Sequence, residues 1–325
     1  MTEKKIIAVV GATGSQGGSL VRAVLDDPDG PFVARALTRN PDSAKAAELA
    51  ARGAEVVRAD LNDEASMTAA FDGAYGAFVV TDSNELHLRQ EAGDGSAARL
   101  ELGQARNAAR AAKVTGLRHV VWSTLEDTRP HFRHLESEAP DVDGDYKVPH
   151  FDAKGEANAY FLSLGVPTTF LETTFFYEVF AGFRKPRRDA DGRLVLSLPM
   201  GDGVMAMVSV EDIGRTAYGI LVGGAPFIGR TVGLAGIHAS GEQLAEIFTR
   251  VLGEKVVYRP IFYQQVRASG QPRAEETANM YQFYTEASEA FLANRDPDRV
   301  RAINPRLRSL EDWLTEHRDE VLSDS

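Results

Sequence analysis

A glycine-rich loop near the start of the chain has a spacing suited to binding phosphate. Five apolar residues, 6–10, lead into Gly11-Ala12-Thr13-Gly14-Ser15-Gln16-Gly17, and a helix-like segment, 19–25, follows. Backbone N–H groups at the start of a helix attract anions, and glycine lets a pyrophosphate come close. A loop that serves only close packing is the weaker explanation, because packing does not need three glycines together with Thr13 and Ser15. We therefore expect a nucleotide cofactor whose diphosphate is cradled by Gly11, Thr13, Gly14, Ser15, Gln16 and Gly17.

An arginine follows the second apolar run and bears on which nucleotide binds. In dinucleotide-binding sheets an acidic residue at this point accepts the ribose 2′-hydroxyl of NAD. Here the sequence is Leu37-Thr38-Arg39-Asn40-Pro41, without a carboxylate. A guanidinium can pair with a 2′-phosphate through charge-assisted hydrogen bonds. Arg39 therefore favours NADP(H), with NAD(H) bound more weakly. Asp42 argues against this preference, and the alternative is an ordinary surface arginine.

Asp60 and Leu61 follow the third apolar run, at 55–58. Asp60 could accept a hydrogen bond from the adenine amino group, with Leu61 against the ring. The alternative is a helix N-cap, a role that Asn62 or Asp63 fits as well. Both interpretations can hold together because different residues would serve them.

Three residues further along could take part in proton transfer: Ser123, His150 and Lys154. Thr81 and Ser123 end predicted strands, where they would line the nicotinamide and ribose side of a cofactor. Lys154 could reach the nicotinamide ribose. Reductases of this architecture carry a tyrosine four residues before such a lysine, but none of the nine tyrosines has this spacing and His150 stands there instead. His150 could donate a proton near neutral pH; alternatively it only orders the loop, and Ser123 only caps a turn.

Two aromatic runs and the histidines allow weaker inferences. The segment Thr174-Phe175-Phe176-Tyr177-Glu178 could bring Phe176 against the nicotinamide, or it could be core, and residues 279–284 have the same ambiguity. The seven histidines show no metal-ligand spacing. His131 and His134 are three apart but lack clustered acidic partners, so we expect no metal site.

The elements that must position these residues alternate between strand and helix. Strands are predicted at 5–10, 32–38, 55–58, 74–80, 119–123 and 168–171, with helices at 19–25, 43–52, 64–71, 97–113 and 154–164. This order predicts an α/β fold with a doubly wound, Rossmann-type parallel sheet. Two polar stretches, 81–96 and 126–149, are predicted as long loops that act as lids or are locally disordered.

The alternation loosens after about residue 173. We expect residues 1–173 to form an NADP-binding domain, to which segments around 205–235 return. Residues 174–325 would form a smaller α+β lobe that closes the cleft, with strands at 194–198, 205–210 and 231–234 and helices at 211–222, 241–252, 271–284 and 309–321.

The amino-acid composition excludes some kinds of chemistry and argues against some kinds of partner. The chain has 325 residues, no cysteine and a formal net charge of −11. Without cysteine, disulfides and thiolate chemistry are excluded, and the acidic charge argues against non-specific binding of nucleic acid. No apolar run is long enough to span a bilayer, so we expect a cytoplasmic protein without a membrane partner. The basic residues within 184–193 are best explained as a solvated loop, with docking of an acidic partner as the alternative.

With these residues in view, the chain resembles the NmrA-like family, a branch of the atypical short-chain dehydrogenase/reductases. The resemblance covers nearly the whole chain, and residues 150–156 together with 279–284 resemble the family's redox-sensor subgroup. The motifs that carry it lie at 11–19, 38–41, 150–156, 196–202, 209–214, 279–284 and 310–314. The resemblance implies bound NADP(H), with the glycine loop on the diphosphate, Arg39 on the 2′-phosphate, Asp60 and Leu61 on the adenine and Lys154 at the nicotinamide end.

Two departures from the family pattern concern the cofactor preference and the cleft. A second basic residue often follows the arginine within a few positions, but here the next base is Lys45. The 81–96 stretch is also longer and richer in glycine than expected.

The resemblance implies an NADP(H)-binding regulator or redox sensor with little or no turnover, whose output is an interaction with a protein partner. The alternative is an NADPH-dependent reductase of a quinone, imine or other carbonyl-like small molecule held in the cleft, using Lys154 and His150 with Ser123 as a helper. A scaffold with a vestigial cofactor site is a third possibility.

Overall fold

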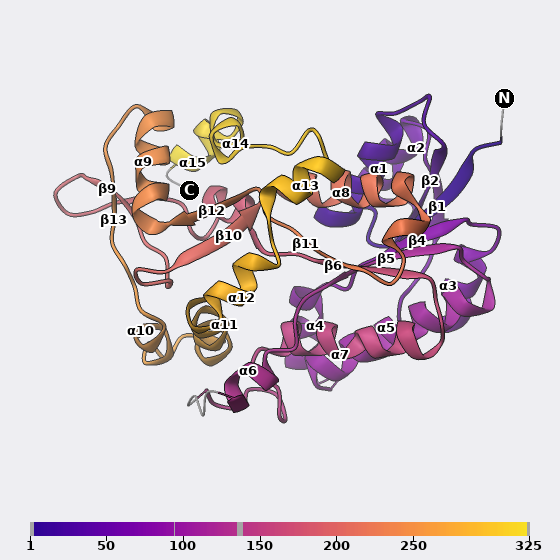
Figure 1. Ribbon diagram of the computed structural model, residues 1–325, viewed down its shortest axis with the longest axis horizontal. Coiled ribbons are helices and arrows are strands. Elements are labelled where there is room, and N and C mark those ends of the chain that lie inside the picture. Colours follow the sequence, from indigo (N-terminus) through magenta and orange to yellow (C-terminus); the bar gives the residue numbers. More distant parts are fainter. Residues whose placement is uncertain (1–2, 94, 135–138, 324–325) are drawn as a thin grey trace. The chain divides into compact units, whose positions relative to one another are not determined.

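The computed structural model describes residues 3–93, 95–134 and 139–323, and Figure 1 labels most of its helices and strands. The chain forms two compact units. The first consists of Met1–Asp127, Pro149–Thr173 and Glu211–Val232, and the second of Thr128–Val148, Thr174–Val210 and Gly233–Ser325. The units are therefore interleaved along the chain. Residues 128–148 group with the second unit, whereas the sequence placed them in a continuous first domain.

The first unit is built on a seven-stranded sheet in the order β11-β6-β5-β4-β1-β2-β3. Its strands are β1 (Lys5–Val9), β2 (Phe32–Thr38), β3 (Glu55–Arg58), β4 (Gly76–Val79), β5 (His119–Thr124), β6 (Thr168–Glu172) and β11 (Thr231–Gly233). The pairings among β1 to β6 are parallel. This order, which runs outward in both directions from β1, confirms the predicted Rossmann-type sheet.

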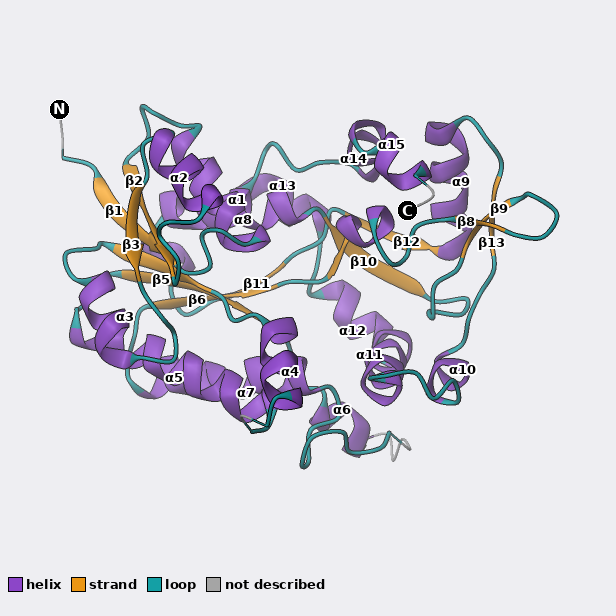
Figure 2. Ribbon diagram, turned by 180° about the vertical axis from the view of Figure 1, so that it is seen from behind, coloured by secondary structure: helices purple, strands orange, loops and turns teal. Residues whose placement is uncertain are grey.

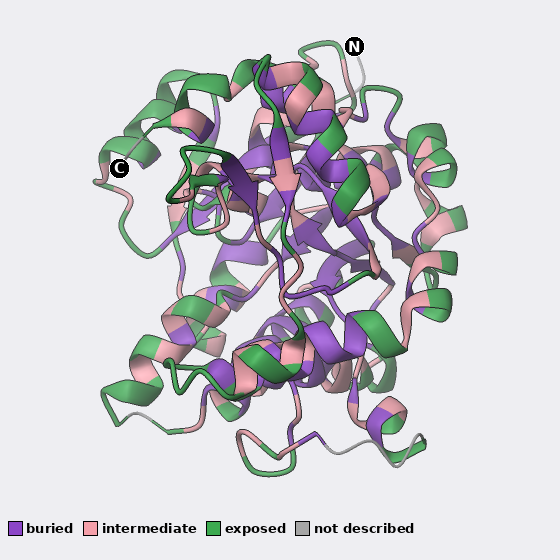
Figure 3. Ribbon diagram, turned by 90° about the vertical axis from the view of Figure 1, so that its left-hand side faces the viewer, coloured by how far each residue is buried: buried purple, intermediate pink, exposed green. Residues whose placement is uncertain are grey.

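Helices cover both faces of this sheet (Figure 2). One face carries α1 (Ser15–Leu25), α2 (Ala44–Ala51) and α8 (Val210–Gly223), and the other carries α3 (Glu64–Phe71), α5 (Ala97–Val114) and α7 (Pro149–Ser163). A short 3₁₀ helix, η2 (Ala225–Phe227), follows α8. Each of these α-helices has buried residues on one side and exposed residues on the other, as the burial colours of Figure 3 show.

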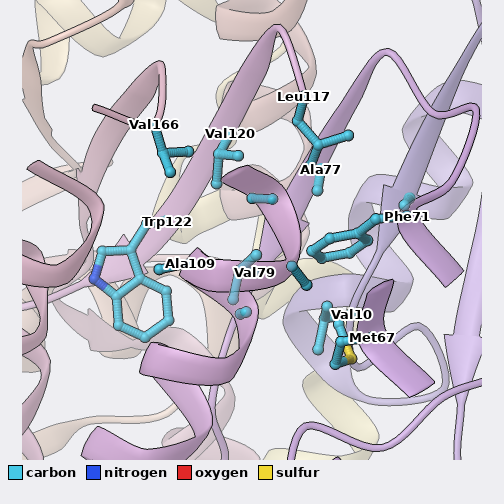
Figure 4. Close-up of a cluster of buried hydrophobic side chains, with 14 of the residues drawn as sticks. Val10, Met67, Phe71, Ala77, Val79, Ala109, Leu117, Val120, Trp122 and Val166 are labelled. Atoms are coloured by element: carbon cyan, nitrogen blue, oxygen red, sulfur yellow. The ribbon is translucent and has the colours of Figure 1, made fainter. Parts of the chain in front are cut away.

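Alanines on one side of α5 let this helix lie close to the sheet. Ala105, Ala108, Ala109 and Ala112 recur at helical spacing and are fully or almost fully buried. They belong to a core cluster that includes Phe71, Val79 and Trp122 (Figure 4). The Trp122 ring stacks on Phe161 of α7 with 5.3 Å between ring centroids. This core fixes α5 and α7 side by side on the sheet.

The two predicted long loops are partly helical, which corrects the sequence-based expectation. Residues 83–91 form α4 (Ser83–Glu91), whose N-cap Asp82 accepts hydrogen bonds from the backbone N–H groups of Asn84 and Glu85. Residues 129–134 form α6 (Arg129–His134). Asp94 and residues 135–138, which belong to the predicted loops, lie outside the described residues. A lone buried apolar residue in α4, Leu86, explains why periodicity did not reveal this helix.

The second unit contains two small three-stranded sheets, in agreement with the predicted α+β character. One has the order β12-β10-β7 and the other β13-β9-β8. Their strands are β7 (Phe175–Phe176), β8 (Arg187–Arg188), β9 (Leu194–Leu196), β10 (Val204–Val208), β12 (Ile237–Ser240) and β13 (Val256–Tyr258). The strand predicted at 205–210 thus pairs within the second unit, while 211–232 belongs to the first.

The remaining helices of the second unit are mostly short. They are α6, η1 (Tyr177–Ala181), α9 (Gly241–Leu252), α10 (Tyr263–Arg267), α11 (Ala274–Glu286), α12 (Ser288–Ala293), α13 (Pro297–Ile303), α14 (Leu310–Glu316) and α15 (Arg318–Leu322). The helix predicted at 309–321 is therefore two helices, α14 and α15. Among the helices that the structure describes, none has the length and apolar character needed to cross a membrane.

A buried histidine on β5 predicts acid-dependent stability. His119 is fully buried, and its Nε2 lies 2.8 Å from the Thr169 hydroxyl, which donates to the Phe227 carbonyl. Burial lowers the pKa of His119 from 6.5 to about 4. The unfolded chain therefore binds the proton more readily, so this contribution to stability is complete above pH 6.5 and is lost as the pH falls towards 4. The loss reaches roughly 3 kcal/mol.

Urea unfolding at several pH values would measure this effect. His119→Gln keeps a polar amide but removes the titrating group, so its stability should fall less than that of the unmodified chain between pH 6.5 and 4. Identical pH profiles for the two proteins would contradict the assignment.

Candidate functional site

The glycine loop makes a tight turn between β1 and α1. Gly11 has a φ of +65°, a conformation that favours glycine. The Gly14 N–H donates to the Gly11 carbonyl at 2.9 Å, and Gly14 is the N-cap of α1. Because glycine has no side chain, it cannot cap the first N–H groups of the helix. The start of α1 is therefore suited to an anion.

Gly17 has a packing role as well as its predicted place at the diphosphate. A Cβ at this position would lie 2.4 Å from the Val10 carbonyl oxygen and 2.5 Å from that of Gly11. Both atoms belong to the backbone, so a side chain here would displace the loop. The three glycines therefore have different roles. Gly11 adopts the backbone conformation of the turn, Gly14 leaves the first N–H groups of α1 without a side-chain cap, and Gly17 lets α1 pack closely on the loop.

A cavity of about 380 Å³ opens beside this loop, at the carboxyl ends of β1 to β4. Ligands of doubly wound sheets bind at this edge, and small-molecule sites have volumes from about 300 Å³ upward. The cavity brings together six of the predicted residues: Gly11, Thr13, Gly14, Arg39, Asp60 and Leu61. Other residues of its lining were not predicted to belong to the site, including Asn62, Asp82, Glu85 and Gln104, and Lys45 was expected only as a departure from the family pattern.

Arg39 lies at the mouth of the cavity with 58% of its side chain exposed, and it forms an ion pair with Glu85 of α4. Lys45, in the first turn of α2, lines the same cavity. Ser43 is the N-cap of α2 and accepts a hydrogen bond from the Ala46 N–H. This cap fixes where α2 begins. Lys45 therefore lies in its first turn and reaches the cavity, although it is six positions after Arg39.

Asp60 and Asp63 have separate roles. Asp63 is the N-cap of α3, as one of the two alternatives proposed. Asp60 lines the cavity and accepts hydrogen bonds from the Asn62 backbone and side-chain N–H groups at 2.9 and 2.8 Å. The Asn62 amide oxygen in turn accepts from Arg89 of α4 at 2.7 Å and from Gln104 of α5 at 3.2 Å. Asn62 therefore ties two helices to this loop.

Lys154 is buried and fully engaged inside the first unit. Its side chain is 8% exposed and forms an ion pair with Glu101 of α5, whose side chain is 2% exposed. It also donates to the Thr81 hydroxyl, and its Nζ lies 3.3 Å from the Thr81 carbonyl oxygen. An ammonium has three donors, and these contacts supply three acceptors. Glu101 was missed by the sequence analysis, although a carboxylate on the buried side of an alanine-rich helix is a visible signal.

The Ser123 side chain contacts Gln16 at the end of the glycine loop. Its hydroxyl donates to the Gln16 side-chain carbonyl at 2.7 Å, which holds the Gln16 side chain in place. His150 lies in the first turn of α7, half-buried, with its ring edge-on to Phe151. Ser15, Gln16, Gly17, Thr81, Ser123, His150 and Lys154 do not line the cavity itself, and their contact with a cofactor remains a prediction.

The aromatic runs belong to the second unit. Phe176 is half-buried in β7, and its predicted contact with the nicotinamide stays a prediction. In the 279–284 run, the Asn279 side-chain amide donates to the carbonyls of Pro140 and Lys147 at 2.9 and 2.8 Å. The Asn279 side-chain oxygen also accepts from Arg267 of α10 at 2.8 Å. This run therefore holds residues 140–147 and α10 on α11.

Two of the five basic residues within 184–193, Arg188 and Arg193, pair with acids of the same unit. Arg188 binds Glu254 with both terminal nitrogens, at 2.6 and 2.8 Å, and Arg193 pairs with Asp189 and Asp191. These two arginines therefore have acidic partners within the chain, and docking of an acidic partner stays a prediction. No group of three or more potential metal ligands occurs among the residues described.

Comparison with known proteins supports this architecture. A sequence model of the NmrA-like family matches residues 3–314. The NmrA-like family domain-containing oxidoreductase FrzB of Cladobotryum sp is 32% identical over 296 residues, which cover 86% of this chain and 83% of the relative. The corresponding oxidoreductase malD of Malbranchea aurantiaca is 32% identical over 79% of this chain and 76% of its own length.

Solved structures share the fold. NmrA, a negative transcriptional regulator crystallised with NADP, has a TM-score of 0.75 at 24% identity and covers 97% of this chain and 95% of its own. The triphenylmethane reductase of Citrobacter sp., crystallised with NADP(H), has a TM-score of 0.67 at 20% identity, with 97% and 99% of the two chains covered. The family match over almost its whole length, with relatives at 32% identity, shows that the chain belongs to the NmrA-like family.

Proposed function

We propose that the chain is an NADP(H)-binding regulatory or redox-sensor protein with little or no turnover. The cavity of the first unit supports the cofactor, because its features fit the parts of the molecule. The open start of α1 suits the diphosphate, and Leu61 with Asp60 suits the adenine. Arg39 and Lys45 supply two cations for the 2′-phosphate, which favours NADP(H) over NAD(H).

The hydrogen bonds and ion pair of the Lys154 side chain are the observation that supports a regulator over an enzyme. Its three donors already have acceptors on Glu101 and Thr81, and Glu101 neutralises its charge. To bind a cofactor ribose or assist a proton transfer, Lys154 would have to give up one of these contacts. The tyrosine expected one turn earlier in a reductase is replaced by His150. A bound nicotinamide would supply a hydride donor, but these residues are better suited to holding the cofactor than to using it.

We further propose that cofactor binding changes an interaction with a protein partner in the cytoplasm, with no direct nucleic-acid or membrane partner. A small-molecule ligand beside the cofactor is compatible with this role.

The second candidate is an NADPH-dependent reductase of a quinone, imine or other carbonyl-like molecule. The names of the fungal relatives, which describe oxidoreductases at 32% identity, favour it. In this case His150 would donate the proton to the substrate, Lys154 would orient the ribose and Ser123 would act through Gln16, with bound NADPH as the source of the hydride.

An assay of NADPH oxidation over a panel of quinones, imines and carbonyl compounds separates the two functions. We expect NADPH to bind but no substrate to give saturable turnover. Saturable turnover that the double variant Glu101→Leu/Lys154→Met abolishes and Lys113→Ala preserves would favour the reductase; Lys154→Ala alone would leave the buried Glu101 carboxylate without its partner. Lys113 is a suitable control because it is an exposed lysine of α5 outside the cavity.

A further inference from the structure

The cavity is more acidic than a site dedicated to a 2′-phosphate needs to be. Its charged lining consists of two cations, Arg39 and Lys45, and three carboxylates, Asp60, Asp82 and Glu85. The formal charges therefore sum to −1. Phosphate bound there would meet repulsion from the carboxylates as well as attraction from the cations.

Glu85 is the carboxylate placed to oppose a 2′-phosphate most directly, because it is ion-paired with Arg39. A phosphate that takes the Arg39 guanidinium must compete with Glu85 for the same donors. The pair is anchored from the α4 side, since Asp82 caps the helix and Arg89 donates to Asn62 at 2.7 Å. Glu85 is therefore held beside Arg39 rather than reaching it from a free surface.

The same carboxylate suits a cofactor without the 2′-phosphate. In NAD-binding sheets an acid after the second strand accepts the ribose 2′-hydroxyl, and this chain has none at that point. Glu85 brings a carboxylate to the same cavity from α4, a different element. A ribose hydroxyl could donate to it while the Arg39 pair stays intact.

We propose that Glu85 is a specificity-determining residue that competes with the 2′-phosphate for Arg39 and accepts the ribose 2′-hydroxyl of NAD(H). By this competition Glu85 lowers the ratio of NADPH to NADH affinity, so that the site binds both dinucleotides. This inference rests on the proposed cofactor site.

Calorimetric titration of NADPH and NADH into the unmodified chain and the Glu85→Gln variant tests the proposal. Glutamine keeps the size of the side chain and removes its charge. Because the ion pair is partly exposed, we expect the ratio of NADPH to NADH affinity to rise about fivefold. Adenosine 2′,5′-bisphosphate should gain affinity in the variant, whereas adenosine 5′-monophosphate should not.

Glu91→Gln is the matched control, because Glu91 is an exposed residue of the same helix outside the cavity lining. An affinity ratio in Glu85→Gln equal to that of the unmodified chain or of Glu91→Gln would overturn the proposal. If NADPH binds and depends on Arg39 while the ratio stays unchanged, only the role of Glu85 fails. If neither dinucleotide binds the unmodified chain, the proposed function fails and this inference with it.

Discussion

Replacing Glu101 by leucine should lower the free energy of unfolding by about 3–5 kcal/mol, because it leaves the Lys154 ammonium buried without its charge partner. Lys154→Met should cost a similar amount by stranding the Glu101 carboxylate. Both side chains are almost fully buried, and they join α5 to α7 across 53 positions of sequence. Urea unfolding of each variant measures the loss.

The double variant Glu101→Leu/Lys154→Met distinguishes this cause from general loss of packing. Because it removes both charges, it should be more stable than either single variant. The exposed pair between Arg110 and Glu64, 3.3 Å apart, is the matched control, and Arg110→Met should cost less than about 1 kcal/mol. Additive losses in the double variant would show that charge pairing is not what Glu101 contributes.

Gly17→Ala should disrupt both the glycine loop and the proposed nucleotide site. Its Cβ would lie 2.4 Å from the Val10 carbonyl oxygen, so the backbone of the loop must shift. We expect a loss of about 1–3 kcal/mol in stability, typical of overpacking. Displacing the start of α1 should also weaken NADPH binding by more than about tenfold, or about 1.4 kcal/mol. Thermal unfolding with and without NADPH measures both effects.

Gly103→Ala is the control for this variant. Gly103 lies within α5, and a Cβ there would meet no atom within 4 Å. Alanine should therefore leave stability unchanged or raise it by up to about 1 kcal/mol, with NADPH binding preserved. Equal behaviour of the two alanine variants would contradict the role given to Gly17.

The elements with strong periodicity could be predicted from the sequence, and those with weak periodicity could not. The apolar run before Gly11 and the alanine-rich segment that became α5 each carried a clear pattern. Helix α4 carried little, because Leu86 is its only buried residue among those described. Its one visible signal was Asp82, an N-cap residue followed by Glu85 in the first turn.

The site was predicted where it follows strand ends and missed where it depends on contacts between distant segments. Arg39 directly follows β2, and Asp60 and Leu61 lie two and three residues after β3, so their place at the cavity followed from the topology. Glu85 and Glu101 reach their partners only because α4 and α5 pack beside segments far away in the sequence. Local patterns contain no information about such pairings.

Calorimetric titration of NADPH and NADH into the unmodified chain and into Arg39→Ala tests the central claim most directly. The proposed site predicts that NADPH binds more tightly than NADH and that Arg39→Ala removes most of this difference. Arg110→Ala, which removes an exposed arginine outside the cavity lining, should leave both affinities unchanged. Equal affinities of the unmodified chain for NADPH and NADH, or a preference for NADPH that survives in Arg39→Ala, would contradict the account.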